Sequence, residues 1–205
     1  MDEQAYPQIK ELRDKIKPYR ELWELYFEYN EKYENAWQKG LLGALDPVQV
    51  GEDWKRMEKK ARELTRDFEK VQKPLAIANK MLTNLGEFKK FLPIITALCN
   101  KGLKDRHKEQ IVELIKGNDD CKDIANQRLD NFKQLNIEHY KNELEEISDT
   151  ATKESNNEGT MATMKNDWLE LEFTCKAVPE KESYILDGAA VEKIQEKLDD
   201  HIIKT

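Results

Sequence analysis

The 205 residues include 34 basic and 41 acidic side chains, a formal net charge of −7, and charged residues (37%) nearly equal hydrophobic ones (39%). Such a mixture is poor in apolar residues for a compact globule and is typical of long helices that bury one stripe and expose the rest. The acidic excess lies in residues 141–205, with 16 acidic against 8 basic side chains, which argues against nucleic acid and anionic membrane as partners.

The cysteines and the apolar runs bear on the cellular compartment. Cys99, Cys121 and Cys175 lie far apart, and an odd, sparse set favours free thiols in a reducing compartment, as small and at least partly buried side chains. The chain opens on an acidic, polar stretch unlike a signal peptide, and no apolar run approaches the roughly 20 residues that span a bilayer. We therefore expect a cytoplasmic protein.

The first 40 residues have the clearest periodicity. Apolar and aromatic residues, with one asparagine, recur in alternating steps of three and four, the heptad pattern of a helix that packs lengthwise on another helix. They are Ile9, Leu12, Ile16, Tyr19, Trp23, Tyr26, Asn30, Tyr33 and Trp37. Pro18 is expected to start a fresh helix or kink a longer one, and Gly40 and Gly43 to end it.

A second element with the same periodicity follows. Asp46 and Pro47 supply a capping side chain and a proline at the first helical position. The apolar positions are Val50, Trp54, Met57, Ala61, Leu64, Phe68, Val71, Leu75, Ala78, Leu82 and Leu85. Because the connection is only about eight residues long, residues 8–85 are predicted to form a long antiparallel helical hairpin. Pro74 is expected to bend its second arm or split it in two.

Shorter elements are predicted in the middle of the chain. Leu92-Pro93 is expected to break the chain before one or two helical turns at 94–98, and a helix is expected at 104–115, ended by Gly117. A loop over 118–128 and a brief helical turn at 129–137 come next. A third long helix is then predicted from about residue 138 to 168, with an apolar stripe at Tyr140, Leu144, Ile147 and Ala151.

The periodicity changes near the C-terminus. The alternating run from Trp168 to Ala177 predicts a strand, residues 179–182 a turn, and 183–186 a short return strand. Asp187 is expected to cap a final helix, with Val191, Ile194, Leu198 and Ile202 on one face. The predicted fold class is mostly α: an elongated helical bundle built on the long helical hairpin, with one small β-hairpin near the C-terminus.

No pattern predicts a catalytic, cofactor-binding or metal-binding residue. Phosphate-binding loops, a nucleophile elbow and spaced metal ligands are missing, and His107, His139 and His201 stand alone. His107 is interpreted either as part of a solvated helix start or, with Arg106, as a residue that bonds to neighbouring loops or a partner. Trp23, Trp37 and Trp54 are expected to pack inside the hairpin, and Trp168 between a helix and the β-hairpin. The acidic end is interpreted as a solvated face or a charged docking surface.

Residues 91–107 resemble a pattern of dynein heavy chains. Phe91–Asn100 followed by Leu103–His107 is similar to the family stretch that runs from leucine-proline to arginine-histidine-tryptophan, although Lys108 stands where the family has tryptophan. Farther on, residues 143–148 resemble an acidic helix of the family and 168–173 its tryptophan-led strand. Residues 184–188, with 194–195 and 198–201, resemble a segment of axonemal rather than cytoplasmic heavy chains. The ordered resemblance covers most of residues 85–205, and residues 1–85 match more loosely.

The resemblance implies a mechanical role at the junction between stem and linker of an axonemal heavy chain. In the family the linker arches over the ATPase ring and swings during the ATP cycle, and this part would transmit the swing to the cargo-binding tail. It implies a stem-proximal helical hairpin (1–90) and the start of the linker (91–205), in a non-catalytic piece excised from a longer chain. Pro74, Gly86 and Leu92-Pro93 are candidate hinges.

The implied partners are the remaining linker and ATPase ring of the same heavy chain, with dynein intermediate or light chains as further candidates. The implied location is the cytoskeleton of a ciliary or flagellar axoneme, and no cofactor is expected in this segment. The fragment is expected to be monomeric.

Two other classes of protein stay open. An independent coiled-coil scaffold or adaptor would pair its heptad seam between chains, although the broken middle and the β-hairpin do not suit a simple coiled coil. A helical enzyme with a dispersed site would reveal itself by turnover or a tightly bound metal.

Overall fold

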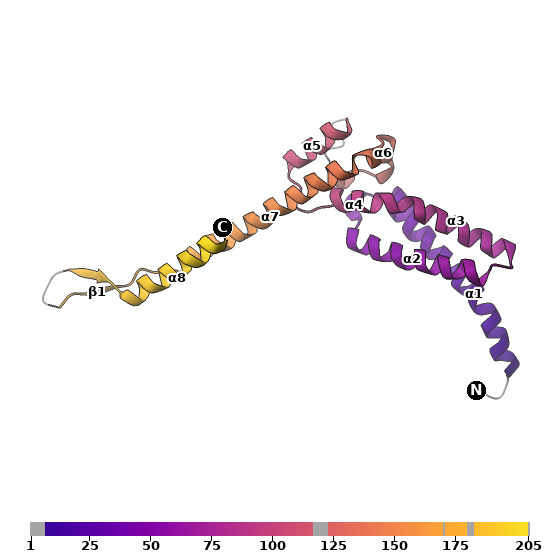
Figure 1. The fold of residues 1–205 in the computed structure, drawn as a ribbon, viewed down its shortest axis with the longest axis horizontal. Helices are drawn as coiled ribbons and strands as arrows, with labels where there is room; N and C mark the ends of the chain where they lie inside the picture. The colour runs from indigo at the N-terminus through magenta and orange to yellow at the C-terminus, as the bar shows by residue number, and fades with distance from the viewer. Residues whose placement is uncertain (1–6, 117–122, 170, 180–182, 205) are drawn as a thin grey trace. The chain divides into compact units, whose positions relative to one another are not determined.

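The computed structural model describes residues 7–116, 123–169, 171–179 and 183–204. Within these residues the chain is mostly helical, with one two-stranded antiparallel sheet near the C-terminus (Figure 1), so the predicted mostly α fold class is confirmed. The chain divides into two compact units, a first unit of Met1–Thr152 and a second unit of Lys153–Thr205.

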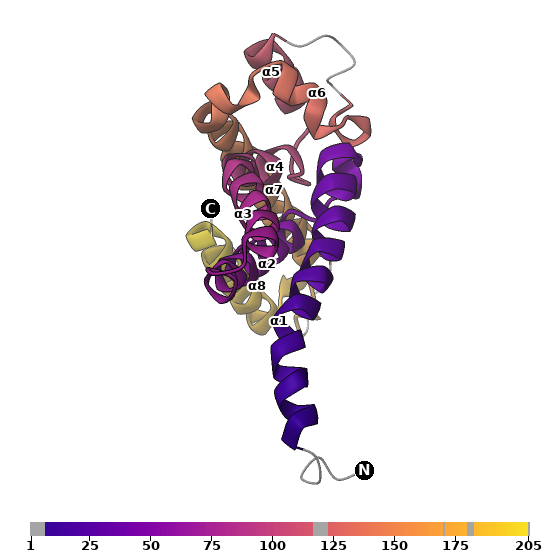
Figure 2. The same ribbon diagram turned by 90° about the vertical axis from the view of Figure 1, so that its right-hand side faces the viewer.

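The first unit begins with three helices: α1 (Pro7–Tyr29), which continues as a π-helical segment (Asn30–Trp37), α2 (Pro47–Asp67) and α3 (Gln72–Phe88). The indole N–H of Trp54, early in α2, donates to the carbonyl of Leu85, late in α3, at 2.8 Å. Tyr19 of α1 packs on Phe68, which follows α2, with ring centroids 4.9 Å apart. Helix α2 therefore runs antiparallel to both α1 and α3, which lie beside it in Figures 1 and 2.

The start of α2 follows the sequence prediction. The Asp46 carboxylate accepts a hydrogen bond from the backbone N–H of Val48 at 3.0 Å, and Pro47 occupies the first helical position. The preceding helix ends before Gly40, as expected. A Cβ on Gly43 would lie 2.9 Å from both the Cβ and the carbonyl oxygen of Ala125, so this close approach needs glycine.

The second arm of the predicted hairpin folds back on itself. The chain turns between Phe68 and Val71, where the N–H of Val71 donates to the carbonyl of Phe68 at 2.9 Å, and α3 then packs along α2. The predicted split therefore falls before Pro74, which lies inside the first turn of α3. Proline is tolerated there because its missing N–H would have no intrahelical acceptor.

The face of α1 that enters the bundle differs from the predicted seam. Leu22, Leu25 and Tyr29 of α1 are buried, and of the predicted seam Trp37, in the π-helical segment, is buried as well. The first six residues of the predicted seam are exposed instead: Ile9, Leu12, Ile16, Tyr19, Trp23 and Tyr26. The expectation for Trp23 was wrong, since 61% of it is exposed, whereas the buried positions of Trp37 and Trp54 are confirmed.

The core of the first unit continues through the middle of the chain. It takes in buried residues of the segment Lys89–Phe91, α4 (Leu92–Leu98), α5 (Asp105–Ile115), α6 (Leu129–Gln134) and the start of α7 (Lys141–Leu169). Lys89–Phe91 is a 3-10 turn, and three further 3-10 turns within the described residues are Leu42–Ala44, Ile124–Asn126 and Ile137–Tyr140. Leu92-Pro93 starts α4 directly after a 3-10 turn, so it does not break the chain as expected. The boundary expected near residue 90 lies inside this core, because α4 packs against α2.

The second unit contains the C-terminal part of α7, the hairpin of β1 (Cys175–Ala177) and β2 (Tyr184–Leu186), and α8 (Gly188–Lys204). Cys175 pairs with Leu186 and Ala177 with Tyr184. The first strand is shorter than predicted because Trp168 and Leu169 still belong to α7. Gly117, Cys121 and residues 180–182 of the predicted turn lie outside the described residues.

Candidate functional site

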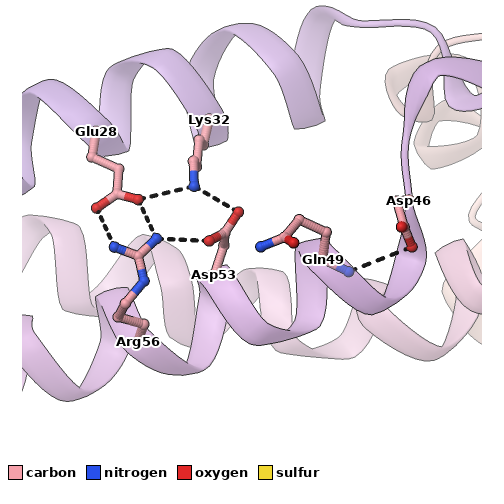
Figure 3. A network of polar contacts seen from close by, with 6 residues as sticks. All are labelled: Glu28, Lys32, Asp46, Gln49, Asp53 and Arg56. Carbon is pink, nitrogen blue, oxygen red and sulfur yellow. Dashed lines mark hydrogen bonds and ion pairs between the residues drawn. The ribbon is translucent and has the colours of Figure 1, made fainter.

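A network of charged side chains joins α1 to α2. Glu28 and Lys32 lie one helical turn apart at the end of α1 and in the π-helical segment, and Asp53 and Arg56 face them from α2 (Figure 3). Lys32 Nζ lies 3.0 Å from Glu28 Oε1 and 2.7 Å from Asp53 Oδ2. Arg56 Nη1 donates to Glu28 Oε2 at 2.9 Å, and Arg56 Nη2 donates to Asp53 Oδ1 at 2.7 Å and to Glu28 Oε1. Each carboxylate therefore contacts both cations.

The network keeps its four groups ionised. Burial opposes ionisation of Asp53, but hydrogen bonds from Lys32 and Arg56 outweigh it and hold the pKa of that carboxyl below its usual range. Burial likewise opposes ionisation of Glu28, and hydrogen bonds from Arg56 and Lys32 lower its pKa. The same bonds raise the pKa of Arg56. A slip of one turn, about 5.4 Å along the helix axis, would break every bond between the helices, so the network fixes their register.

A column of aromatic rings continues the contact from α1 to α3. Tyr29 stacks on Tyr33 with ring centroids 4.7 Å apart, and Trp37 stacks on Phe88 of α3 at 5.2 Å. Tyr29, Tyr33 and Trp37 are spaced by four residues, and the wider π-helical turn, with hydrogen bonds from i to i+5, keeps them on one face. The Asn84 amide of α3 donates to the Tyr29 hydroxyl at 2.7 Å.

Asn100 links the end of α4 to the start of α7. Its side-chain N–H groups donate to the carbonyl and the hydroxyl of Ser148, at 2.9 and 2.8 Å, and to the hydroxyl of Thr152 at 2.8 Å. Its carbonyl oxygen accepts from the Gly102 N–H at 2.8 Å. A Cβ on Gly102 would lie 2.9 Å from the Ala151 carbonyl, so glycine lets this turn approach α7. The Asn100 side chain thus joins the turn after α4 to α7, which is distant in sequence.

Of the two interpretations of His107, the solvated helix start is wrong. It is buried rather than solvated, with 2% of it exposed. Its ring Nδ1 accepts a hydrogen bond from the backbone N–H of Lys104 at 3.2 Å. The ring therefore caps the start of α5 through a bond to the chain just before it. Lys108, the next residue along α5, pairs with Asp105 at 3.2 Å.

A smaller polar cluster joins α7 to α8 inside the second unit. The indole N–H of Trp168 donates to Nδ1 of His201 at 3.0 Å, and Nε2 of His201 lies 3.3 Å from Asp167. Lys197 pairs with Asp167 at 3.1 Å. Hydrogen bonds from Lys197 and His201 lower the pKa of the Asp167 carboxyl. Trp168 therefore contacts α8 through His201, and it remains 37% exposed, so it is not the core residue expected.

The described residues hold no grouping of three or more metal-ligating side chains, and none of their helices is long and apolar enough to cross a membrane. Cys99 is half-buried, its thiol donates to the Leu42 carbonyl at 3.4 Å, and burial raises its pKa to about 11. Cys175 is exposed, contrary to expectation. Of the candidate hinges, Pro74 and Gly86 lie within α3 and Leu92-Pro93 begins α4.

Sequence reasoning missed the residues that join the helices. Glu28 and Arg56 are 28 positions apart and Asn100 and Ser148 are 48 apart, so helical periodicity contains no signal for either contact. Asn100 does lie inside the stretch that resembles dynein heavy chains. The register of the α1–α2 network could be derived once the short connection at 38–46 is taken to make the helices antiparallel.

Comparisons with known proteins place the chain in a family. The sequence model of the family described as dynein heavy chain, N-terminal region 2, matches residues 9–205. The human dynein axonemal heavy chain 3 is 30% identical over 204 residues, covering 100% of this chain and 5% of that protein. The rat dynein axonemal heavy chain 1 is 24% identical over 200 residues, covering 98% of this chain and 4% of the relative. The chain thus spans about one twentieth of the length of these relatives, and it belongs to the dynein heavy-chain family as an N-terminal region of the axonemal type.

Proposed function

We propose that this chain works as a segment of a longer axonemal dynein heavy chain, where it links the cargo-binding tail to the ATPase ring and transmits the power stroke. It would act in the cytoskeleton of the ciliary or flagellar axoneme. Its main partners would be the remaining linker and the ATPase ring of the same polypeptide, with intermediate or light chains as further candidates. The segment itself would supply no catalytic group and hold no cofactor.

The observation that supports this proposal most is the continuity of the first unit. Buried residues from Leu22 in α1 to Leu144 in α7 form one cluster. Charged and aromatic contacts fix α1 against α2 and α3, and Asn100 fixes α7 against the end of α4. Protein interiors are close-packed and have low compressibility, so a displacement applied at α1 would reach α7 with little loss. A segment that passes force along the chain needs this property.

The experiment is a comparison of ATP hydrolysis with microtubule gliding in the heavy chain that contains this segment. Glu28→Gln with Asp53→Asn removes both carboxylates of the network without changing side-chain size. We expect the ATPase rate to stay close to that of the unaltered motor and the gliding velocity to fall, because part of each stroke would be lost in sliding between α1 and α2.

The matched control is Glu58→Gln, which removes a carboxylate that pairs, within the described part of the chain, with Arg62 of the same helix and with no residue of α1. This variant should glide at the unaltered velocity. Gliding that survives the double change at full velocity, or ATP hydrolysis that falls in proportion to gliding, would contradict the proposed function.

A further inference from the structure

Helix α1 carries an apolar row that the described part of the first unit does not cover. Ile9, Leu12, Ile16, Tyr19, Trp23 and Tyr26 all have more than a third of their surface exposed, and together they extend about 26 Å at 1.5 Å per residue. The first turns of α1 extend past the ends of α2 and α3, as Figures 1 and 2 both show. Tyr19, in contact with Phe68, marks where the bundle ends.

The row has the spacing of a coiled-coil seam. Its members alternate steps of three and four, and this pattern seats side chains between those of a second helix of the same periodicity. A different row, with Leu22, Leu25 and Tyr29, faces α2 and α3. Contiguous apolar patches on the surface of a folded unit commonly mark a site of association. The shape and spacing of the row therefore indicate a helix as its occupant.

The charges beside the row define the chemistry of that helix. The positions that flank a seam at Arg13, Lys15 and Arg20 are all basic, and no acidic residue flanks the row there. Lys15 pairs with Glu11 and Arg20 with Glu24 inside α1, but these pairs are exposed and such pairs are weak. Residues 8–20 contain five basic and two acidic side chains, in a chain whose net charge is −7.

We propose that the exposed row of α1 is a docking surface for one amphipathic helix with a heptad apolar seam and acidic flanking residues, supplied by another segment of the same heavy chain. Flanking charges determine which helices pair in coiled coils. A second copy of α1 is disfavoured, because the basic flanks of two copies would face each other. The proposal rests on the proposed function only in taking the heavy chain as the source of the helix.

The surface can be tested on this chain with two designed helical peptides. Both have leucine at the seam positions, one with glutamate and the other with lysine at the flanking positions, and binding is followed by fluorescence anisotropy of a dye on the peptide. The glutamate-flanked peptide should bind roughly tenfold more tightly, since three exposed charge pairs favour it and like charges oppose the other peptide. The preference should weaken at high salt.

Two variants separate the seam from its flanks. Ile9→Asp with Ile16→Asp should abolish binding, whereas Met161→Asp, at an exposed methionine in the second unit, should leave it unchanged. Arg13→Glu with Arg20→Glu should reverse the preference and favour the lysine-flanked peptide. Circular dichroism checks that each variant keeps its helices. Equal binding of both peptides, binding that survives the aspartate changes, or self-association of the free chain through α1 would overturn the proposal.

The source of the helix is tested separately, by zero-length cross-linking of amines to carboxylates in the longer heavy chain together with its accessory chains. Links from Lys10, Lys15 or Lys17 to acidic residues in another segment of the same polypeptide would support the proposal. Links only to a different polypeptide would overturn the proposed source. Either result leaves the gliding test of the proposed function unaffected, so failures of the two ideas can be told apart.

Discussion

At the scale of single residues, the hydrogen bonds of Asn100 and the charged network between α1 and α2 stabilise the first unit in different ways. Asn100 uses both its amide N–H groups and its carbonyl oxygen, and every partner lies on α7 or in the adjacent turn. The charged network between α1 and α2 instead relies on ionisation, since each carboxylate contacts both Lys32 and Arg56. Loss of the Asn100 hydrogen bonds should therefore lower the free energy of unfolding, whereas loss of the network carboxylates should lower it by an amount that depends on pH.

We predict that Asn100→Ala lowers the free energy of unfolding of the first unit by roughly 1–3 kcal/mol, the usual cost of leaving partly buried polar groups without their hydrogen bonds. Urea denaturation followed by circular dichroism measures this loss. Asn126→Ala is the control, because Asn126 is exposed and its side-chain amide donates to the nearby Asp123; it should change the free energy by less than about 0.5 kcal/mol. Equal losses for the two variants would contradict the role of Asn100.

The network predicts a pH dependence. The pKa values of Glu28 and Asp53 are lower in the folded protein than in the unfolded chain, so the stability that these carboxylates contribute is present above the unfolded values near 4. It is lost as the pH falls through the lower folded values. The Glu28→Gln, Asp53→Asn variant should thus be less stable than the unaltered chain at pH 7, and the difference should shrink below about pH 4.

The measurement is urea unfolding of both proteins at a series of pH values. Glu58→Gln, which removes a carboxylate outside the network, should show only a small difference in stability from the unaltered chain at pH 7. A difference between the double variant and the unaltered chain that stays constant from pH 7 to pH 3 would mean that the two carboxylates do not stabilise the folded state by their charge.

At the scale of elements, α1 has two apolar rows, and only one of them is used within the described bundle. The row of Leu22, Leu25 and Tyr29 has the same steps of three and four as the exposed row, so periodicity alone cannot choose between them. Contacts with α2 and α3 determine which row of α1 is buried, and these contacts are made by residues distant in sequence. The π-helical segment Asn30–Trp37 also changes the spacing of the face, which a strict heptad does not anticipate.

Truncation of a side chain in the buried row should cost far more stability than truncation in the exposed row. Leu25→Ala should lower the free energy of unfolding by about 2–5 kcal/mol, because Leu25 is 2% exposed and its removal leaves a cavity. Trp23→Ala should change it by less than about 0.5 kcal/mol, although tryptophan is the larger side chain. Thermal and urea unfolding of both variants measure these changes. A larger loss for Trp23→Ala would place the predicted seam, rather than the observed row, in the bundle.

Local sequence signals located several helix ends, but they did not locate the turn between α2 and α3 or the contacts between residues far apart in sequence. Asp46-Pro47 and the apolar stripe of α7 at Leu144 and Ala151 were predicted from capping and periodicity and are confirmed. The turn at 68–71 was not located, because it contains no proline or glycine and the apolar periodicity continues through it. Asn100 was missed as a linking residue because its contacts with α7 depend on tertiary structure.

At the scale of the whole molecule, the chain is an N-terminal region of an axonemal dynein heavy chain that contains two compact units. The first unit joins α1 to the start of α7 through a single buried cluster. If the unit carries force as one body, it should resist a pull applied across it until the cluster ruptures as a whole. The expected domain boundary near residue 90 would instead allow the two sides to separate in turn.

Optical tweezers test this mechanical continuity most directly, with handles attached at Arg20 of α1 and Asp149 of α7, both exposed. We predict one abrupt unfolding step that releases a contour length on the order of 400 Å, at roughly 3.3–3.6 Å for each residue between the handles. The Glu28→Gln, Asp53→Asn variant should rupture at a lower force. Several small steps at low force, or a first step that releases only the residues on one side of residue 90, would contradict the claim that the first unit transmits force as one body.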